Sequence, residues 1–223
     1  MHVIRSYRTH PHLPGIASSV VLLAAWSGIV MLVMRAFESP SVIDALVSTS
    51  FYYTTQSNIL VAVLMVIAFT RLRHTKLFAS FAFIAFFDIS VTAIVFHALI
   101  GPYMETVGFI QHVLHTLTPL LYVLWYLFDF KDTPTVRSSL ISLIHPVVFM
   151  VFVFALVVPF FSDLMIRTSD GFAGAEYLYP FLNPASFESG VMGMILFNLF
   201  VLAPAFVIWA LGLQRIKSKC EPE

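Results

Sequence analysis

Hydrophobic residues along this chain of 223 residues gather in six long segments, which are separated by stretches rich in charged residues, glycine or proline. A helix needs about 20 apolar residues to cross the hydrocarbon core of a bilayer, and each segment reaches or nearly reaches that length. The segments cover residues of about 15–35, 51–70, 77–100, 110–128, 139–161 and 189–212. The pattern therefore predicts an all-α integral membrane protein, with residues 1–223 forming a single bundle of six transmembrane helices.

Lysine and arginine are distributed unevenly over the predicted loops. Ten of the twelve lie in the N-terminal region, the second-to-third loop, the fourth-to-fifth loop and the C-terminal tail, whereas Arg35 and Arg167 lie on the opposite side. Because cytoplasmic loops carry an excess of positive charge, both termini are expected to be cytoplasmic. A basic N-terminus that precedes an apolar run without a small-x-small cleavage site predicts an uncleaved signal anchor in the cell membrane.

The composition agrees with a membrane protein and argues against several other classes. Hydrophobic residues make up 59% of the chain and charged residues 11%, with a mean hydropathy of +0.91. The net charge is zero, with 12 basic and 12 acidic residues, which argues against a nucleic-acid partner. The single cysteine, Cys220, excludes an internal disulfide and a cysteine-based zinc site. Membrane lipids are the expected partners, and no cofactor is predicted.

Two polar clusters stand at the mouths of apolar segments: FYYTTQSN at residues 51–58 and QHVLHTLTP at residues 111–119. In lipid, a polar side chain without a partner costs several kcal/mol, so we interpret the clusters as two halves of one site. On a helix, Thr54, Ser57 and Asn58 share a face. The alternative is structural, with Thr54 bonded to a carbonyl one turn earlier and Asn58 tying two helices together.

The second cluster combines two histidines with a proline at helical spacing. His112 and His115 share a face, and Pro119 lies four residues after His115. Proline lacks an amide hydrogen and crowds the carbonyl four residues back, so a kink with a freed acceptor is expected at His115. An ionisable residue within a membrane is by default a functional hypothesis; a histidine satisfied within the core is the alternative.

The predicted topology brings other polar residues to the same outer end of the bundle. His97 closes the third segment there, and Tyr179 lies in the long loop before the last segment. Thr54 and His115 are the candidate catalytic residues, because an imidazole can take the proton of a hydroxyl and an acyl-enzyme divides one difficult step into two. The candidate contacts to an oxyanion or a substrate are Asn58, His97, His112 and Tyr179.

Two further ionisable residues lie within apolar segments. Asp88 is near the middle of the third segment, about 13 Å along the helix axis from His97 and half a turn around it. We therefore place Asp88 outside the site and expect it to pair with a hydroxyl or with a neighbouring helix. His145, which precedes Pro146, is interpreted as structural.

The ordered set FYYTTQSNILV, VTAIVFHALI, HTLTPLLYVLWYLF, LIHPVVFMVF and YPFL resembles the androgen-induced-gene and androgen-dependent TFPI-regulating protein family of membrane threonine hydrolases and its bacterial relatives. The resemblance covers most of the chain from about residue 50 to residue 210. It implies a multi-pass hydrolase that cleaves fatty acid esters of hydroxy fatty acids. The motif matches place the nucleophile on Thr54 and the histidine on His115. The run Gln56-Ser57-Asn58 departs from the animal members.

Two alternatives remain open at this point. One is an intramembrane zinc hydrolase in which His97, His112 and His115 bind the metal, because three histidine ligands suit a catalytic zinc with an open position. The other is a non-catalytic protein that binds or transports lipid, with the polar clusters holding helices together. The first hypothesis remains a hydrolase whose lipid substrate enters a site open toward the outer leaflet.

Overall fold

The structure is a computed structural model that describes residues 15–104, 106–132, 134–169 and 174–220. The described residues are mostly helical and contain no strand, which confirms the all-α class. The α-helices are α1 (Ile16–Phe37), α2 (Val42–Phe51), α3 (Tyr53–Ile67), α4 (Lys76–Val95), α5 (Phe109–His112), α6 (Thr118–Leu124), α7 (Val136–Ser142), α8 (Ile144–Phe152), α9 (Val158–Thr168), α10 (Val191–Phe197) and α11 (Ala203–Cys220). Short π-helical and 3-10 turns join several of them into longer runs.

Four of these runs are long and apolar enough to cross a membrane: Ile16–Phe37, Lys76–Tyr103, Val136–Thr168 and Val191–Cys220. A fifth crossing results if α2 and α3, which meet at a bend of 87°, together form one broken span. The expected fourth segment is helical from Phe109 to Asp129 but is not among these runs. The described residues thus support a multi-pass membrane protein with four or five spans, and the count of six stays a prediction.

Two expected boundaries were wrong. Residues 42–51 form α2 instead of a connection, and the Ser41 side chain caps this helix by accepting a hydrogen bond from the Asp44 N–H at 3.3 Å. Helix α3 begins at Tyr53, after the bend, whereas the second segment was expected to begin at residue 51. The run Val136–Thr168, which corresponds to the expected fifth segment, continues seven residues past the expected end at residue 161. The expected loop at residues 162–187 is therefore shorter than predicted. Its described part consists largely of 3-10 turns.

Prolines account for four of the five π-helical turns in the described chain. These turns are Phe96–Ile100, Val113–Leu117, Val153–Val157 and Asn198–Leu202, and Pro102, Pro119, Pro159 and Pro204 follow two residues after them. In each case the central residue of the turn lies four positions before the proline. Proline crowds that carbonyl and cannot donate to it, so the helix widens there. The irregularity expected at Pro119 is thus a π turn centred on His115, in which the Thr118 N–H donates to the Val113 carbonyl.

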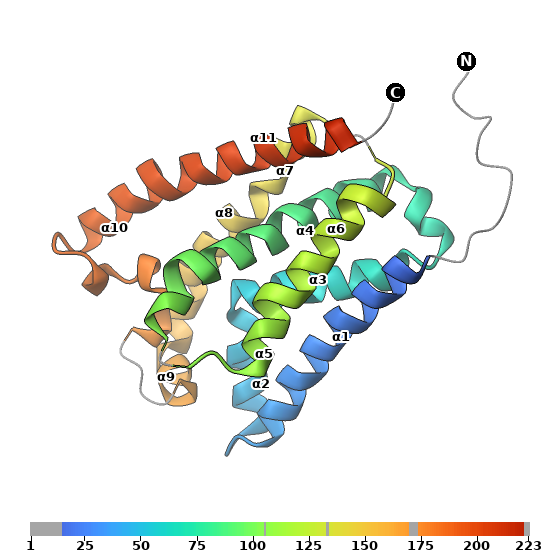
Figure 1. The fold of residues 1–223 in the computed structure, drawn as a ribbon. Coiled ribbons are helices and arrows are strands. Elements are labelled where there is room, and N and C mark those ends of the chain that lie inside the picture. Colours follow the sequence, from blue (N-terminus) through green and yellow to red (C-terminus); the bar gives the residue numbers. More distant parts are fainter. Residues whose placement is uncertain (1–14, 105, 133, 170–173, 221–223) are drawn as a thin grey trace, which may run out of the picture.

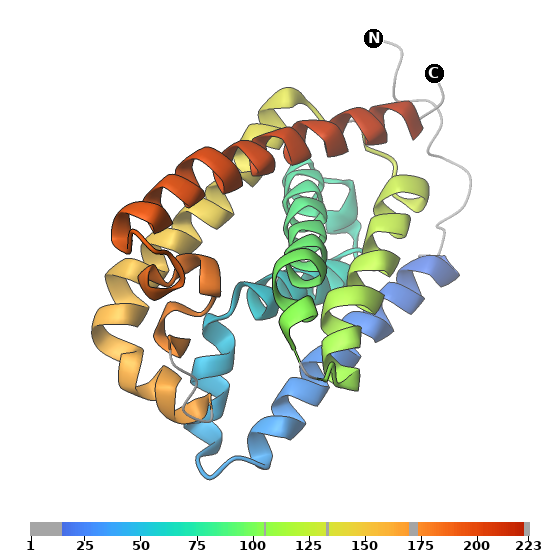
Figure 2. The same cartoon turned by 60° about the vertical axis from the view of Figure 1, so that its left-hand side comes forward.

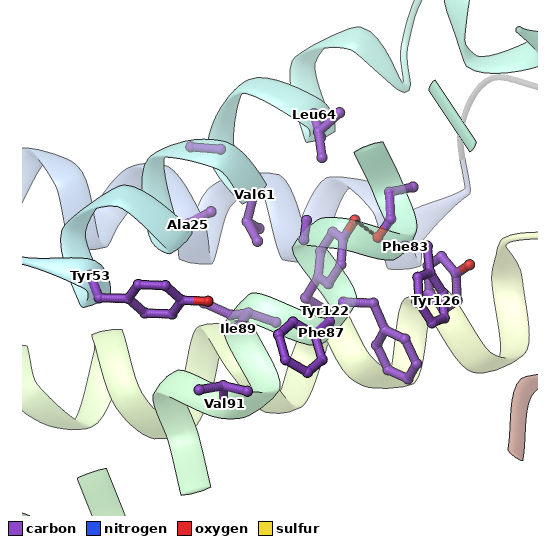
Figure 3. Close-up of a cluster of buried hydrophobic side chains, with 14 of the residues drawn as sticks. Ala25, Tyr53, Val61, Leu64, Phe83, Phe87, Ile89, Val91, Tyr122 and Tyr126 are labelled. Atoms are coloured by element: carbon purple, nitrogen blue, oxygen red, sulfur yellow. Dashed lines mark hydrogen bonds between the residues drawn. The ribbon is translucent and has the colours of Figure 1, made fainter. Parts of the chain in front are cut away.

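Helix α4 forms the centre of the molecule, and Figures 1 and 2 show it enclosed by the other helices. Phe83 and Phe87 of α4 are completely buried, as are Tyr122 and Tyr126 of the run from Phe109 to Asp129. Figure 3 shows these rings packed between α3, α4 and α6. The Tyr122 hydroxyl donates to the Ala82 carbonyl at 3.1 Å, which satisfies the polar end of a ring inside an apolar core.

The basic connections gather at one end of the bundle. The Ser18 hydroxyl at the start of α1 donates to Asp129 at 3.4 Å, and Lys217 near the end of α11 donates to the Leu127 carbonyl at 3.4 Å. The connection between α3 and α4 also lies at this end (Figure 1). The start of α1 and the end of α11 therefore lie at the same end of the molecule. Which side of a membrane this is stays a prediction.

Candidate functional site

Thr54 is the second residue of α3, immediately after the bend that separates α3 from α2. Tyr52, at the bend, has an extended backbone with φ −70° and ψ 136°, so α3 starts as a new helix. The first N–H groups of a helix have no helical partner and carry partial positive charge. The Thr54 N–H instead donates to the hydroxyl of Tyr179 at 3.3 Å. The sequence thus places the Thr54 side chain at a helix N-terminus, where developing negative charge is stabilised.

His115 faces Thr54 from the centre of the π turn Val113–Leu117. Its Nε2 lies 3.2 Å from the Thr54 Oγ1, and its Nδ1 lies 3.0 Å from the Gln111 carbonyl oxygen. A carbonyl oxygen can only accept a hydrogen bond, so Nδ1 carries the proton and Nε2 presents a lone pair to the Thr54 hydroxyl. This is the tautomer that a general base requires, and the two candidate catalytic residues are in contact in the structure.

The His115 ring is fixed by packing as well as by hydrogen bonding. Phe96 stacks on it with a centroid distance of 3.9 Å and an interplanar angle of 19°. The histidine is 6% exposed, and Phe96 is 3% exposed. Phe96 could not be singled out in the sequence, because it is one of many aromatic residues in a uniformly apolar run. The ring confines the imidazole to the plane in which Nε2 points at Thr54.

Asn58 connects the two helical segments that carry the dyad. Its Nδ2 donates to the Thr54 carbonyl at 2.8 Å and to the Leu114 carbonyl at 3.2 Å, one residue before His115. The Asn58 side chain is completely buried and does not line the cavity described below. The structure therefore does not support the expected role of Asn58 as an oxyanion contact. Asn58 ties two helices together, as the structural alternative predicted for this residue.

Tyr179 reaches the dyad from the segment between α9 and α10, as expected. Its hydroxyl lies 3.4 Å from the Thr54 Oγ1, and its ring stacks on Phe181 with a centroid distance of 5.2 Å. Asn198 anchors this segment by donating to the Phe181 carbonyl at 2.8 Å. Burial raises the pKa of Tyr179 to about 12, so the hydroxyl keeps its proton at physiological pH. It can therefore donate to an oxygen that develops negative charge beside Thr54.

The dyad opens into an apolar cavity of about 200 Å³. Thr54, His115 and Tyr179 contribute polar atoms to its wall, and the wall also contains Tyr53, Thr92 and Asn198. The remaining lining residues are apolar and come from four parts of the chain: Val91, Val95, Phe96, Ile100, Leu143, Pro146, Val147, Phe149, Met150, Phe181, Leu182, Leu202, Ala203, Phe206 and Val207. Mostly apolar walls with a few convergent polar groups are typical of a ligand-binding site.

The structure does not bring His97 and His112 into this site. His97 points to an exposed position, where its Nε2 lies 3.0 Å from the Thr116 Oγ1, and His112 is also exposed. Neither residue lines the cavity, so their expected contacts to an oxyanion or a substrate were wrong. Among the described residues no group of three or more histidine, cysteine or acidic side chains is arranged to hold a metal ion. His97, His112 and His115 therefore do not form the zinc site that the alternative required.

A second polar cluster includes Tyr53, the residue immediately before Thr54. Asp88 accepts a hydrogen bond from the Tyr53 hydroxyl at 2.5 Å and lies 2.7 Å from the Nδ1 of His145. Asp88 was expected to pair with a hydroxyl or with a neighbouring helix, and the structure shows a hydroxyl, of Tyr53, and a residue of α8, His145. The His145 ring stacks on the Tyr53 ring with a centroid distance of 4.8 Å. Its Nε2 lies 3.3 Å from the Gln56 side-chain oxygen, a partner that the sequence analysis did not identify.

Gln56 extends this cluster to the bend between α2 and α3. Its amide nitrogen lies 3.3 Å from both the Ser50 and the Phe51 carbonyl oxygens. These carbonyls belong to the last turn of α2, where helical partners are missing. The chain of contacts from Asp88 through His145 to Gln56 therefore ends on the bend that places Thr54 at the start of a helix.

Comparisons with models of protein families, with curated proteins and with solved structures found no match to this chain. The resemblance to the androgen-induced-gene family therefore stays a prediction.

Proposed function

We propose that this protein is an intramembrane hydrolase of lipid esters, such as fatty acid esters of hydroxy fatty acids, with Thr54 as nucleophile and His115 as base. The observation that carries the proposal is the contact of 3.2 Å between Thr54 Oγ1 and His115 Nε2, with the other ring nitrogen bonded to a carbonyl. A nucleophile that contacts a base, which a third group orients, is the arrangement of covalent acyl transfer.

The reaction follows from the positions of these groups. The Thr54 oxygen bonds to the ester carbonyl carbon while its proton passes to His115 Nε2, and the carbonyl oxygen becomes an oxyanion. The carbon–oxygen bond of the leaving alcohol then breaks, and His115 returns the proton to that alcohol. Water attacks the resulting acyl-threonine with His115 again as base, which releases the fatty acid and restores Thr54. The Tyr179 hydroxyl and the positive end of α3 stabilise the oxyanion.

The site also suggests how the protein is oriented in the membrane. The basic connections lie at one end of the bundle, and Tyr179 with its segment lies at the other, where α9 ends and α10 begins. Because cytoplasmic loops carry an excess of positive charge, we place both termini on the cytoplasmic side of the cell membrane. The dyad then lies in the outer leaflet, and its substrate comes from the lipids of that leaflet.

The proposal is tested by labelling the purified, detergent-solubilised protein with an ester-like fluorophosphonate probe. Wild type and Thr54→Ser, which keeps a hydroxyl, should label, and Thr54→Ala should not. Thr116→Ala is the matched control, because Thr116 also contacts a histidine, at 3.0 Å, but lies at an exposed position outside the cavity. Equal labelling of wild type and Thr54→Ala would contradict the proposal. A folded protein without labelling or ester turnover would favour the non-catalytic alternative.

Removing the hydroxyl of Tyr179 should slow the chemical step. Because this hydroxyl lies 3.4 Å from the Thr54 Oγ1 and lines the cavity, Tyr179→Phe is expected to lower kcat by about 10²–10³, the usual effect of losing one oxyanion donor. The ring and its stacking on Phe181 are retained. Tyr177→Phe is the control, because Tyr177 lies in the same segment, packs against Phe154 and does not line the cavity. Steady-state kinetics on a chromogenic ester measure both, and equal kcat values for the two variants would assign Tyr179 a structural role.

A further inference from the structure

The cavity is elongated along the helices that form its walls. On α4 and the π turn after it, the lining extends from Val91 to Ile100, a distance of about 13 Å at 1.5 Å per residue. On the last run it extends from Asn198 to Val207, which is again about 13 Å. The cavity, of about 200 Å³, is therefore an elongated apolar channel, a shape that one hydrocarbon chain can occupy.

The two ends of the cavity are chemically different. At the outer end, Phe96 stacks on His115, and Asn198 donates to the Phe181 carbonyl next to Tyr179. At the deep end, Phe206 contacts Phe87 edge-on with a centroid distance of 6.0 Å. The Trp209 indole N–H donates to the Ser90 hydroxyl at 2.8 Å, just beyond this contact. The ester chemistry thus lies at the outer end, and an apolar channel extends from it toward a closed floor.

The outer end is covered by protein, whereas one flank of the channel is not. Tyr179 is 8% exposed and Leu182 is 1% exposed, so the segment before α10 closes the cavity toward the outer aqueous side. Among the residues that line the cavity, the exposed apolar ones are Val147 of α8 and Ala203 and Val207 of α11. Val147 is 60% exposed and Val207 is 36% exposed. These side chains face both the channel and the outer surface of two membrane-spanning runs.

We propose that the flank between α8 and α11 is a lateral portal, through which one acyl chain of the substrate passes from the bilayer into the channel while its ester reaches Thr54. This inference rests on the proposed hydrolase function and specifies its substrate as a lipid with a chain long enough to lie in the portal. The occupant is an acyl chain because the flank consists of apolar side chains, is continuous with the channel and would face lipid tails in a membrane. A substrate that entered from water would instead meet the buried segment around Tyr179.

The portal is tested by comparing two esters with each variant: a long-chain ester presented in phosphatidylcholine vesicles and a short-chain, water-soluble ester. Val147→Trp and Val207→Trp should lower the ratio of long-chain to short-chain turnover about tenfold, which corresponds to about 1.4 kcal/mol of activation free energy. Val148→Trp and Ile208→Trp are matched controls. Val148 and Ile208 are 55% and 71% exposed but do not line the cavity, so the ratio should be unchanged.

An unchanged ratio in both portal variants would overturn the portal, as would an equal fall of the ratio in the two controls. Val207→Phe replaces the tryptophan variant if the latter does not fold, since it narrows the same position with a smaller ring. Failure of the proposed function has a different signature, because wild type would then hydrolyse neither ester.

Discussion

Replacing His115 by alanine is expected to lower ester turnover by about 10²–10⁴, the usual contribution of a positioned general base. The imidazole Nε2 is the nitrogen that faces the Thr54 hydroxyl, at 3.2 Å, and the ring is held by the Gln111 carbonyl and by Phe96. Because the proton of Thr54 moves only as the transition state forms, kcat should fall while KM stays nearly unchanged. Steady-state kinetics on a chromogenic ester, with single-turnover burst measurements, separate the two constants.

His97→Ala provides the matched control for this prediction. His97 contacts a threonine hydroxyl at a similar distance, 3.0 Å to Thr116, but this second pair is exposed and lies outside the cavity. Its removal should therefore leave both kinetic constants close to the wild-type values. If His115→Ala retained full turnover, or if His97→Ala were equally inactive, the assignment of His115 as base would be wrong.

Thr54 and His115 could be selected as candidates from the sequence, because polar side chains without partners are costly in a bilayer and clusters of them are therefore rare in apolar segments. Thr54 and His115 lie 61 positions apart, yet each opens an apolar segment on the same predicted side. Two buried polar clusters at one depth have few partners other than each other. Pro119 added a second signal, since its effect on the helix falls on His115. Tyr179 could be anticipated only as part of a loop that returns to that end.

The wider site could not be predicted to the same degree. His97, His112 and His115 appear equivalent in sequence, because all three lie near one end of a span. The structure separates them by helix face, since only the His115 side chain points toward α3, whereas His97 and His112 are exposed. Helix phase is altered by the π turns at residues 96–100 and 113–117, each of which shifts the register of the following helix. A periodicity of 3.6 residues therefore assigns faces wrongly past these turns.

The bend between α2 and α3 was missed for a related reason. Residues 42–51 contain Asp44 and three serine or threonine residues near the end of the helix, which weakens the hydrophobic pattern there. The bend is stabilised by contacts over long sequence separations, through Gln56 to His145 and from His145 to Asp88. Such contacts leave no trace in local periodicity. Their importance leads to the second large effect that we expect.

Replacing Asp88 by alanine should destabilise the protein by about 1–3 kcal/mol, the cost of leaving a buried polar group without its hydrogen-bond partner. The carboxylate is completely buried and contacts both the Tyr53 hydroxyl and His145 Nδ1. Its loss leaves the buried Tyr53 hydroxyl without its acceptor and the Nδ1 of the partly exposed His145 without its partner. Gln56 then contacts a histidine that is no longer fixed by Asp88. Thermal unfolding in detergent, followed by tryptophan fluorescence, measures the change. Asp44→Asn is the control, since Asp44 pairs with Arg167 at 3.4 Å on a partly exposed surface and should cost at most about 1 kcal/mol.

Asp88→Asn separates hydrogen bonding from charge in this network. An asparagine oxygen can accept from Tyr53, and its amide can donate to His145 Nδ1, while the Nε2–H of the histidine still donates to the Gln56 oxygen. Every member of the network then keeps a partner, so most of the stability lost in Asp88→Ala should be retained. Because the bend keeps Thr54 at the start of α3, turnover should follow stability: Asp88→Asn stays active, and Asp88→Ala loses activity as it loses structure. An asparagine variant as unstable as the alanine variant would show that the negative charge of Asp88, rather than its hydrogen bonds, holds the bend.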